Sequence, residues 1–261
     1  MSTNYQNHQD KKKNADFDYI DINNAKNKAR YEDNDVEMGY DYEKTYNVNL
    51  RLGFIRKVYG ILSIQLLITT FLCSLTFIDA VKVFFQTNVW LFWTCLILSI
   101  VVIIPLICFK SVSTKVPTNY IMLLIWTFCE AYMVATCCSF YEPKIVLAAA
   151  ALTCAVTLGL TYYACTTKTD FTVCGGFLFV AGILLLFLGL LSIFLPFLHT
   201  LYCVLGVLLY SVYLLFDTQL IMGKYENGYE IDDYIIAAIM IYIDIIQIFL
   251  YLLELFGNRN N

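Results

Sequence analysis

Seven uninterrupted apolar runs, each long enough to cross a lipid bilayer, constrain this chain more than any other feature of its sequence. A membrane-spanning α-helix needs about 20 predominantly apolar residues in succession. Runs of this length are found at Phe54–Phe77, Val89–Phe109, Thr118–Phe140, Lys144–Cys165, Thr172–Leu195, Leu198–Met222 and Tyr234–Phe256. They are continuous rather than alternating, which excludes the strands of a transmembrane barrel. The sequence therefore predicts an all-α membrane protein folded as a seven-transmembrane-helix bundle.

The overall composition agrees with a chain that lies largely within lipid. Of its 261 residues, 59% are hydrophobic and 15% are charged, whereas soluble domains are about 45–50% apolar and about 25% charged. The ten cysteines lie between Cys73 and Cys203, mostly inside apolar runs and without a C-x-x-C pair. We therefore expect them to be small buried hydrophobic residues rather than a disulfide or metal framework. The net charge of -4 does not indicate a nucleic-acid partner.

The N-terminal segment differs in composition from the rest of the chain. Residues Met1–Val48 are rich in Asn, Asp, Lys, Glu and Tyr and show no apolar periodicity. Such a segment cannot bury enough surface to fold alone, so we expect a disordered tail at 1–48, followed by a transmembrane domain at 49–261. No apolar core follows the basic residues of the tail, which predicts that the first span, and not a cleaved signal peptide, directs the chain to the membrane.

The distribution of lysine and arginine predicts how the bundle is oriented. If the N-terminus is cytosolic, the cytosolic face receives Arg51, Arg56, Lys57, Lys110, Lys115, Lys168 and Lys224. The opposite face then receives only Lys82, Lys144 and Arg259. The positive-inside rule favours this arrangement. With seven spans, the C-terminus is expected on the non-cytosolic side.

Two aspartates inside consecutive spans, Asp217 and Asp244, are the strongest candidates for a functional site. A charged carboxylate at the centre of a membrane helix costs about 2.5–3.5 kcal/mol on insertion scales. The sixth and seventh spans should form an antiparallel hairpin, with both aspartates between its cytosolic third and the bilayer centre. Two close carboxyl groups in a low dielectric should share a proton and respond to pH. The alternative is an interhelical hydrogen bond that only stabilises the bundle.

Other polar residues of the spans could support this pair. Gln219 and Gln247 place amides nearby, and Gln247 follows Asp244 by three residues, on much the same helix face. Glu130 could be a protonated acid bonded to a neighbouring helix, or it could line a pathway. Glu254, near the end of the last span, is expected to reach the headgroups. Carboxylate oxygens suit calcium, so the aspartate pair is also a candidate for transient calcium binding.

Three other classes of membrane protein fit the sequence poorly. Seven-span receptors place the N-terminus outside, and the chain has neither a D-R-Y after its third span nor an N-P-x-x-Y in its seventh. A retinal protein needs a lysine in its last span, but the last lysine is Lys224. Intramembrane aspartyl proteases use Y-D, G-x-G-D and P-A-L, whereas Asp217 follows Phe216 and Asp244 follows "MIYI". We therefore do not expect an enzyme.

Several stretches together resemble the Bax inhibitor / lifeguard family of transmembrane proteins. They are "GFIRKVYGILSIQLLIT" (53–69), "FDTQLIMG" (216–223) and "YIDIIQIFLYLLELFG" (242–257), with "VPTNYIMLLIWTFCEAYMVA" before and within the third span. The resemblance runs from about Arg51 to the end of the chain. The opening motif is similar to that of the lifeguard branch.

The resemblance carries structural and functional expectations. It implies a bundle with the last helix central, a calcium leak across endoplasmic-reticulum or Golgi membranes, and suppression of cell death. The family's pH-sensitive aspartates fall on Asp217 and Asp244. A basic residue at the cytosolic end of the second span can bind the first aspartate in this family; Lys110 is the nearest candidate for this latch, with Lys115 next, although lysine lacks the bidentate fork of arginine.

The resemblance also bears on partners and cofactors. No resident cofactor is expected, because calcium would be the permeant ion. Besides the lipid bilayer, other membrane proteins of cell-death or calcium signalling are the expected partners. The alternative function is that of a non-conducting membrane interaction protein that regulates apoptosis signalling or other channels.

Overall fold

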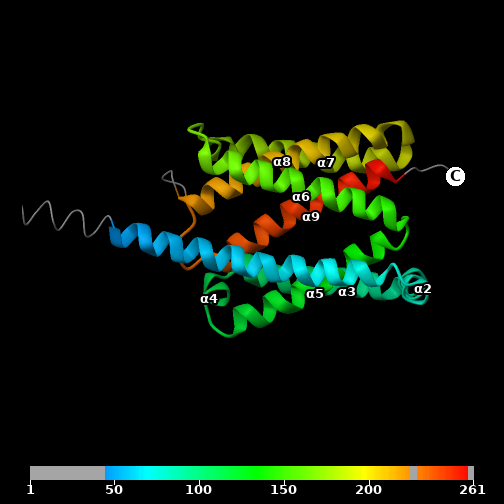
Figure 1. The fold of residues 1–261 in the computed structure, drawn as a ribbon, viewed down its shortest axis with the longest axis horizontal. Helices are drawn as coiled ribbons and strands as arrows, with labels where there is room; N and C mark the ends of the chain where they lie inside the picture. The colour runs from blue at the N-terminus through cyan, green and yellow to red at the C-terminus, as the bar shows by residue number, and fades with distance from the viewer. Residues whose placement is uncertain (1–44, 224–227, 258–261) are drawn as a thin grey trace, which may run out of the picture. The chain divides into compact units, whose positions relative to one another are not determined.

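The computed structural model describes residues 45–223 and 228–257, and within those ranges the chain folds into helices without a β-strand (Figure 1). The first helix is Thr45–Leu75. It is followed by α2 (Asp79–Thr87), α3 (Val89–Cys108), α4 (Lys110–Ser113), α5 (Thr118–Cys138), α6 (Pro143–Thr166), the 3₁₀ turn η1 (Thr172–Cys174), α7 (Gly175–Phe194), the 3₁₀ turn η2 (Pro196–Leu198), α8 (His199–Met222) and α9 (Tyr234–Phe256). The predicted all-α class is confirmed.

Seven of the described helical segments are long and apolar enough to cross a membrane, as predicted. The break between the fifth and sixth spans lies where proline requires it. Leu195 is extended, with φ -124° and ψ 84°, and Pro196 opens the short turn η2. Proline has no N–H for the helical ladder and disfavours helical backbone at the preceding residue, so α7 and α8 are separate helices and not one kinked helix.

The described part of the chain is helical from its first residue. Thr45, where the description starts, already lies in the first helix, ahead of the predicted span start at Phe54. Residues 1–44, which form most of the predicted tail at 1–48, lie outside the described residues, so the tail stays a prediction. The same holds for Lys224, Arg259 and the chain end, on which part of the orientation argument depends. Two short helices, α2 and α4, were not predicted, because neither is long enough to produce an apolar run of membrane length.

The last helix, α9, is the core of the bundle. In its most apolar 18-residue window, 72% of residues are buried, compared with 17% in α3, α6 and α7. It packs against α8, α6 and α5, and Figure 1 shows it running between the α6–α8 group and the group formed by the first helix, α3 and α5. Large side chains along its length, among them Ile235, Tyr242 and Leu253, are almost fully buried. The central position of the last helix is therefore confirmed.

Polar side chains connect the helices of the bundle. Gln65 Nε2 of the first helix donates to Thr127 Oγ1 of α5 at 3.1 Å, and Thr69 Oγ1 lies 2.8 Å from the Tyr242 hydroxyl of α9. Such interhelical bonds hold membrane bundles together, because lipid tails are as apolar as the side chains they replace. None of the ten cysteines, all of them described, forms a disulfide. Cys73, Cys129, Cys138 and Cys203 are buried as predicted, whereas Cys108 and Cys154 lie on the bundle surface.

Candidate functional site

The antiparallel helices α8 and α9 bring the two predicted aspartates together. Asp217 lies in the last turns of α8 and Asp244 in the first half of α9. Both are buried, with 7% and 4% of their surface exposed, and their carboxyl groups form a hydrogen bond with each other. A hydrogen bond between two carboxyl groups requires a proton on one of them. We call Asp217 and Asp244 the carboxyl pair.

The connection between α8 and α9 contributes a third group, which the sequence did not single out. The Tyr229 hydroxyl forms a hydrogen bond with Asp217. Burial, followed by the proximity of Asp217 and Asp244, raises the pKa of the Tyr229 phenol, so it remains a neutral donor. Asp244 Oδ2 is buried and has no hydrogen-bond partner among the described residues. A buried acceptor without a partner is costly, and a proton or a cation would relieve that cost.

A cavity of about 1110 Å³ reaches the carboxyl pair from between α7, α8 and α9. Asp217, Asp244 and Tyr229 line one part of it, together with Tyr210 and Tyr213. His199, at the start of α8, and Glu254, near the end of α9, line it too. Because α8 and α9 are antiparallel, these two residues mark the opposite end of the cavity from the carboxyl pair. Among the described residues that line it there is no lysine or arginine.

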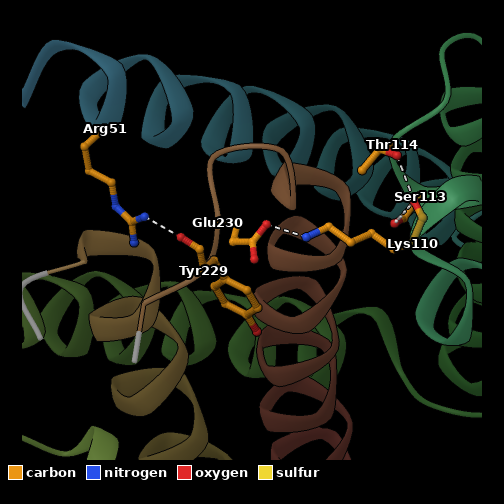
Figure 2. A network of polar contacts seen from close by, with 6 residues as sticks. All are labelled: Arg51, Lys110, Ser113, Thr114, Tyr229 and Glu230. Carbon is orange, nitrogen blue, oxygen red and sulfur yellow. Dashed lines mark hydrogen bonds and ion pairs between the residues drawn. The ribbon is translucent and has the colours of Figure 1, made fainter. Parts of the chain in front are cut away.

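Arg51 of the first helix fastens the connection that covers the carboxyl pair (Figure 2). Its Nη1 donates to the Tyr229 carbonyl at 2.5 Å, and its Nη2 donates to the carbonyl of Leu220 in the last turn of α8. The carbonyls at a helix C-terminus lack partners within the helix and attract cations. Gly223 ends α8 in the left-handed conformation, with φ 60°, and a Cβ there would lie 2.4 Å from the Arg51 guanidinium.

Lys110 contacts the same connection from α4. Its Nζ pairs with the carboxylate of Glu230, the residue after Tyr229. Figure 2 shows the side chains of Arg51 and Lys110 reaching these two neighbouring residues of one loop. Both side chains of this pair are mostly exposed, at 59% and 71%. The hydrogen bond to Glu230 raises the pKa of Lys110. Lys110 pairs with Glu230 in this structure and not with Asp217, so the latch on the first aspartate stays a prediction.

The polar residues predicted as possible supports of the pair are Gln219, Gln247 and Glu130. Gln219 is fully buried, but its amide accepts from the Phe171 N–H at 2.8 Å and donates to the Thr169 carbonyl at 2.9 Å, so it anchors the connection between α6 and α7. Gln247 is half-buried on α9. Glu130 accepts a hydrogen bond of 2.6 Å from Ser99 of α3 and does not line the cavity, which fits the bonded alternative.

Glu254 lies in a different environment from the predicted one. Instead of extending alone towards headgroups, its carboxylate lies 3.5 Å from His199 Nε2 and 3.4 Å from Cys203 Sγ. Neither His199 nor Cys203 was a candidate from the sequence. The four-residue spacing of the two, which puts them on one helix face, was the available signal.

The fold and the buried carboxyl pair define a multi-pass integral membrane protein built around its last helix. A protein-family model described as "Inhibitor of apoptosis-promoting Bax1" matches residues 51–261, and the chain belongs to this Bax inhibitor / lifeguard family. It is 38% identical to Protein lifeguard 3 of Homo sapiens over 218 residues, which cover 81% of this chain and 70% of that protein. For Protein lifeguard 3 of Mus musculus the identity is 35%, covering 81% and 71%. For Protein LIFEGUARD 4 of Arabidopsis thaliana it is 38% over 217 residues, covering 79% and 85%. The resemblance inferred from the motifs is confirmed.

Proposed function

We propose that this protein is a pH-sensitive calcium leak channel of endoplasmic-reticulum or Golgi membranes, and that through calcium it suppresses cell death. The observation that carries the proposal is the contact between Asp217 and Asp244, buried at one end of a cavity between α7, α8 and α9. The proposal assigns the pair two occupants that exclude each other, a proton and a passing cation.

The charge balance of the cavity supports this assignment. The neighbours of the pair along the wall are the hydroxyls of Tyr210, Tyr213 and Tyr229, which are neutral near pH 7. No basic side chain among the described lining residues lies near the pair. A second negative charge on the pair therefore needs compensation by a proton or a cation, because an uncompensated buried charge is strongly destabilising. Protonation and cation binding therefore compete for the same oxygens.

The ligand chemistry supports calcium as the cation. Calcium takes six to eight oxygen ligands, many of them carboxylate oxygens. Asp217 and Asp244 offer at most four carboxylate oxygens, and one of these, Asp244 Oδ2, has no hydrogen-bond partner within the described chain. The pair therefore supplies part of a calcium shell, with water completing it, and suits a passing ion better than a resident one.

The proposed orientation places the N-terminus in the cytosol. Arg51 and Lys110 come from separate parts of the sequence, yet both contact the loop between α8 and α9 (Figure 2). Basic residues that gather at one end of a bundle are typical of the cytosolic face. Epitope tags at the two chain ends, tested for protease protection in sealed microsomes, should show a cytosolic N-terminus and a protected C-terminus.

A non-conducting membrane interaction protein is the second candidate. The description of the matching family model favours it, because that description names an apoptosis-promoting protein and no ion. In this case the protein would bind other membrane proteins of the cell-death machinery, and the carboxyl pair would serve as an interhelical hydrogen bond.

Purified full-length protein in calcium-loaded liposomes separates the two candidates. We expect calcium release above that of protein-free liposomes, with a rate that changes between mildly acidic and neutral pH. Asp217→Asn should flatten this pH response, because asparagine keeps size and hydrogen bonding but does not titrate in that range. Glu130→Gln is the matched control: it also removes an acid inside a span, half-buried and outside the cavity, and its pH response should remain. No release at any pH favours the interaction protein, and a pH-independent wild-type leak removes the gating role.

A further inference from the structure

Three side chains of different chemistry meet where α8 begins and α9 ends. His199 and Cys203 are one turn apart in α8 and therefore share a face, opposite Glu254 of α9. Cys203 Sγ lies 3.8 Å from His199 Nδ1 and 3.4 Å from Glu254 Oε2, and His199 Nε2 lies 3.5 Å from that same oxygen. One ligand atom from each residue can be chosen so that all three lie within 4.8 Å of one another.

These separations are close to those of a tetrahedral zinc site. With a Zn–S bond of about 2.3 Å and Zn–N and Zn–O bonds of about 2.0–2.1 Å, the ligand atoms of a tetrahedron are about 3.3–3.6 Å apart. The distance from Cys203 Sγ to Glu254 Oε2 already falls in that range. His199 offers one nitrogen to a metal ion: Nδ1 lies 3.8 Å from the sulfur, and Nε2 lies 3.5 Å from the carboxylate oxygen. With one atom from each residue, the three ligand atoms lie within 4.8 Å of one another. Rotation of the His199 ring and the Glu254 side chain, both partly exposed, can supply the remaining movement.

The packing around the cluster holds its two helices close together. Gly206, less than one turn after Cys203, faces Tyr251 of α9, and a Cβ at Gly206 would lie 2.7 Å from the Tyr251 ring. The Tyr251 hydroxyl in turn donates to the Tyr202 hydroxyl at 3.1 Å. This close approach keeps Cys203, which is fully buried, opposite Glu254.

We propose that His199, Cys203 and Glu254 bind a zinc ion at the end of the cavity opposite the carboxyl pair. A nitrogen, a sulfur and an oxygen ligand together suit zinc, whereas calcium requires a shell of oxygens. Three protein ligands leave a fourth coordination position, and two of the ligands, His199 and Glu254, line the cavity. Water in the cavity can occupy that position. Ten residues of α9 separate Glu254 from Asp244, or about 15 Å along the helix, so this site is distinct from the pair and does not depend on calcium conduction.

Cobalt titration of the purified, metal-free, full-length protein in detergent tests the site. Cobalt(II) substitutes for zinc and reports its ligands, through visible bands of a tetrahedral ion and a near-ultraviolet charge-transfer band from a thiolate. We expect both in the wild type at stoichiometric cobalt, and we expect zinc, but not a large excess of calcium, to remove them. A wild-type protein without the thiolate band overturns the proposal, whatever the variants do.

Substitutions assign the ligands. Cys203→Ser should abolish the charge-transfer band, and His199→Gln and Glu254→Gln should each weaken zinc binding more than about 100-fold, beyond the 10–100-fold that loss of a supporting residue costs. Cys73→Ser, at a buried cysteine of the first helix, is the matched control and should keep the band. Cys203 is buried, so its substitution can disturb the packing as well as remove a ligand. Glu254→Gln, at a partly exposed position, is therefore the independent test. Wild-type zinc affinity in Glu254→Gln, or a charge-transfer band that survives in Cys203→Ser, contradicts the site.

Discussion

The two ends of one cavity differ in almost every property that decides what binds there. At one end, Asp217 and Asp244 are both buried and offer only oxygen, next to a connection that Arg51 fastens and Lys110 contacts at the surface. At the other end, His199 and Glu254 are 20% and 41% exposed in their side chains and form an oxygen–nitrogen–sulfur cluster with Cys203. The same two helices, α8 and α9, build both ends. Local side-chain chemistry, and not the fold, therefore decides which ion each end suits.

The comparison also shows where a proton can act. Glu254 has a close basic side-chain partner, because its carboxylate lies 3.5 Å from His199 Nε2. The carboxyl pair has no such partner among the described lining residues and must share a proton or attract a cation. A response of the protein to pH is thus expected to originate at the pair, which the following experiments test in order of expected effect.

The largest effect is expected from removing both carboxyl groups. Asp217→Asn and Asp244→Asn should each abolish most of the pH dependence of calcium release, and the double variant should add little. The reason is that two groups sharing a proton titrate as one unit. The measurement is the leak rate from liposomes across pH for the two single variants and the double variant.

The opposite end provides the control for this experiment. Zinc affinity at His199, Cys203 and Glu254 should be the same in the double variant as in the wild type. Single variants that each lose only half of the pH response, with losses that add in the double variant, would mean that the two carboxyl groups titrate independently.

A smaller but clear loss of stability is expected when the α8–α9 connection next to the pair loses its contact with Arg51. Arg51→Gln removes charged donors to the carbonyls of Leu220 and Tyr229. Hydrogen bonds to charged groups contribute about 1.5–3 kcal/mol each, so the variant should lose on the order of 2 kcal/mol or more of stability. Thermal unfolding should show a lower midpoint, and hydrogen exchange should be faster at residues 228–233.

Arg56→Gln is the matched control for the Arg51 experiment. It removes the same charge from an exposed position of the same helix and should behave as the wild type does. Equal exchange rates at residues 228–233 in Arg51→Gln and the wild type would contradict the role assigned to Arg51.

Gly223→Ala should lower stability by an amount comparable to, or slightly smaller than, that of Arg51→Gln. An L-residue in the left-handed conformation costs about 1–2 kcal/mol, and the added Cβ would meet the Arg51 guanidinium. The thermal midpoint should fall, whereas Gly60→Ala, at a helical glycine where an added Cβ would meet no atom within 4 Å, should leave it unchanged or raise it. A Gly223→Ala variant as stable as Gly60→Ala would show that the end of α8 does not need this conformation.

The smallest effect is expected from the surface ion pair. Lys110→Ala and Glu230→Ala remove an exposed contact that salt screens, so neither should measurably change the thermal midpoint. The two variants should also have the same leak rate as each other at every pH. A leak that changes in Lys110→Ala but not in Glu230→Ala would instead support the predicted latch between Lys110 and Asp217.

Residues whose role depends on local pattern were predictable from the sequence, whereas residues whose role depends on a distant partner were not. Asp217 and Asp244 could be found because a carboxyl group inside an apolar run is costly wherever the helices pack. Arg51 could not, because its partners, Leu220 and Tyr229, are 169 and 178 residues further along the chain. Gln219 was predicted as a possible support of the pair, but the sequence did not reveal its partners: its amide binds the α6–α7 connection, about 50 residues earlier in the chain.

Seven membrane-length helices, helix breaks at residues such as Pro196, and two acids within consecutive spans were all predictable from the sequence. Each of these follows from a local property: apolar length, backbone restriction or the cost of a buried charge. That α9 is the core, while the more hydropathic α7 lies at the surface of the bundle, was not predictable from hydropathy. Lipid is as apolar as a protein interior, so hydropathy cannot rank the spans by burial, and close packing between particular side chains decides their positions. The same packing places Glu254 against His199 and Cys203, where the sequence predicted only a headgroup contact.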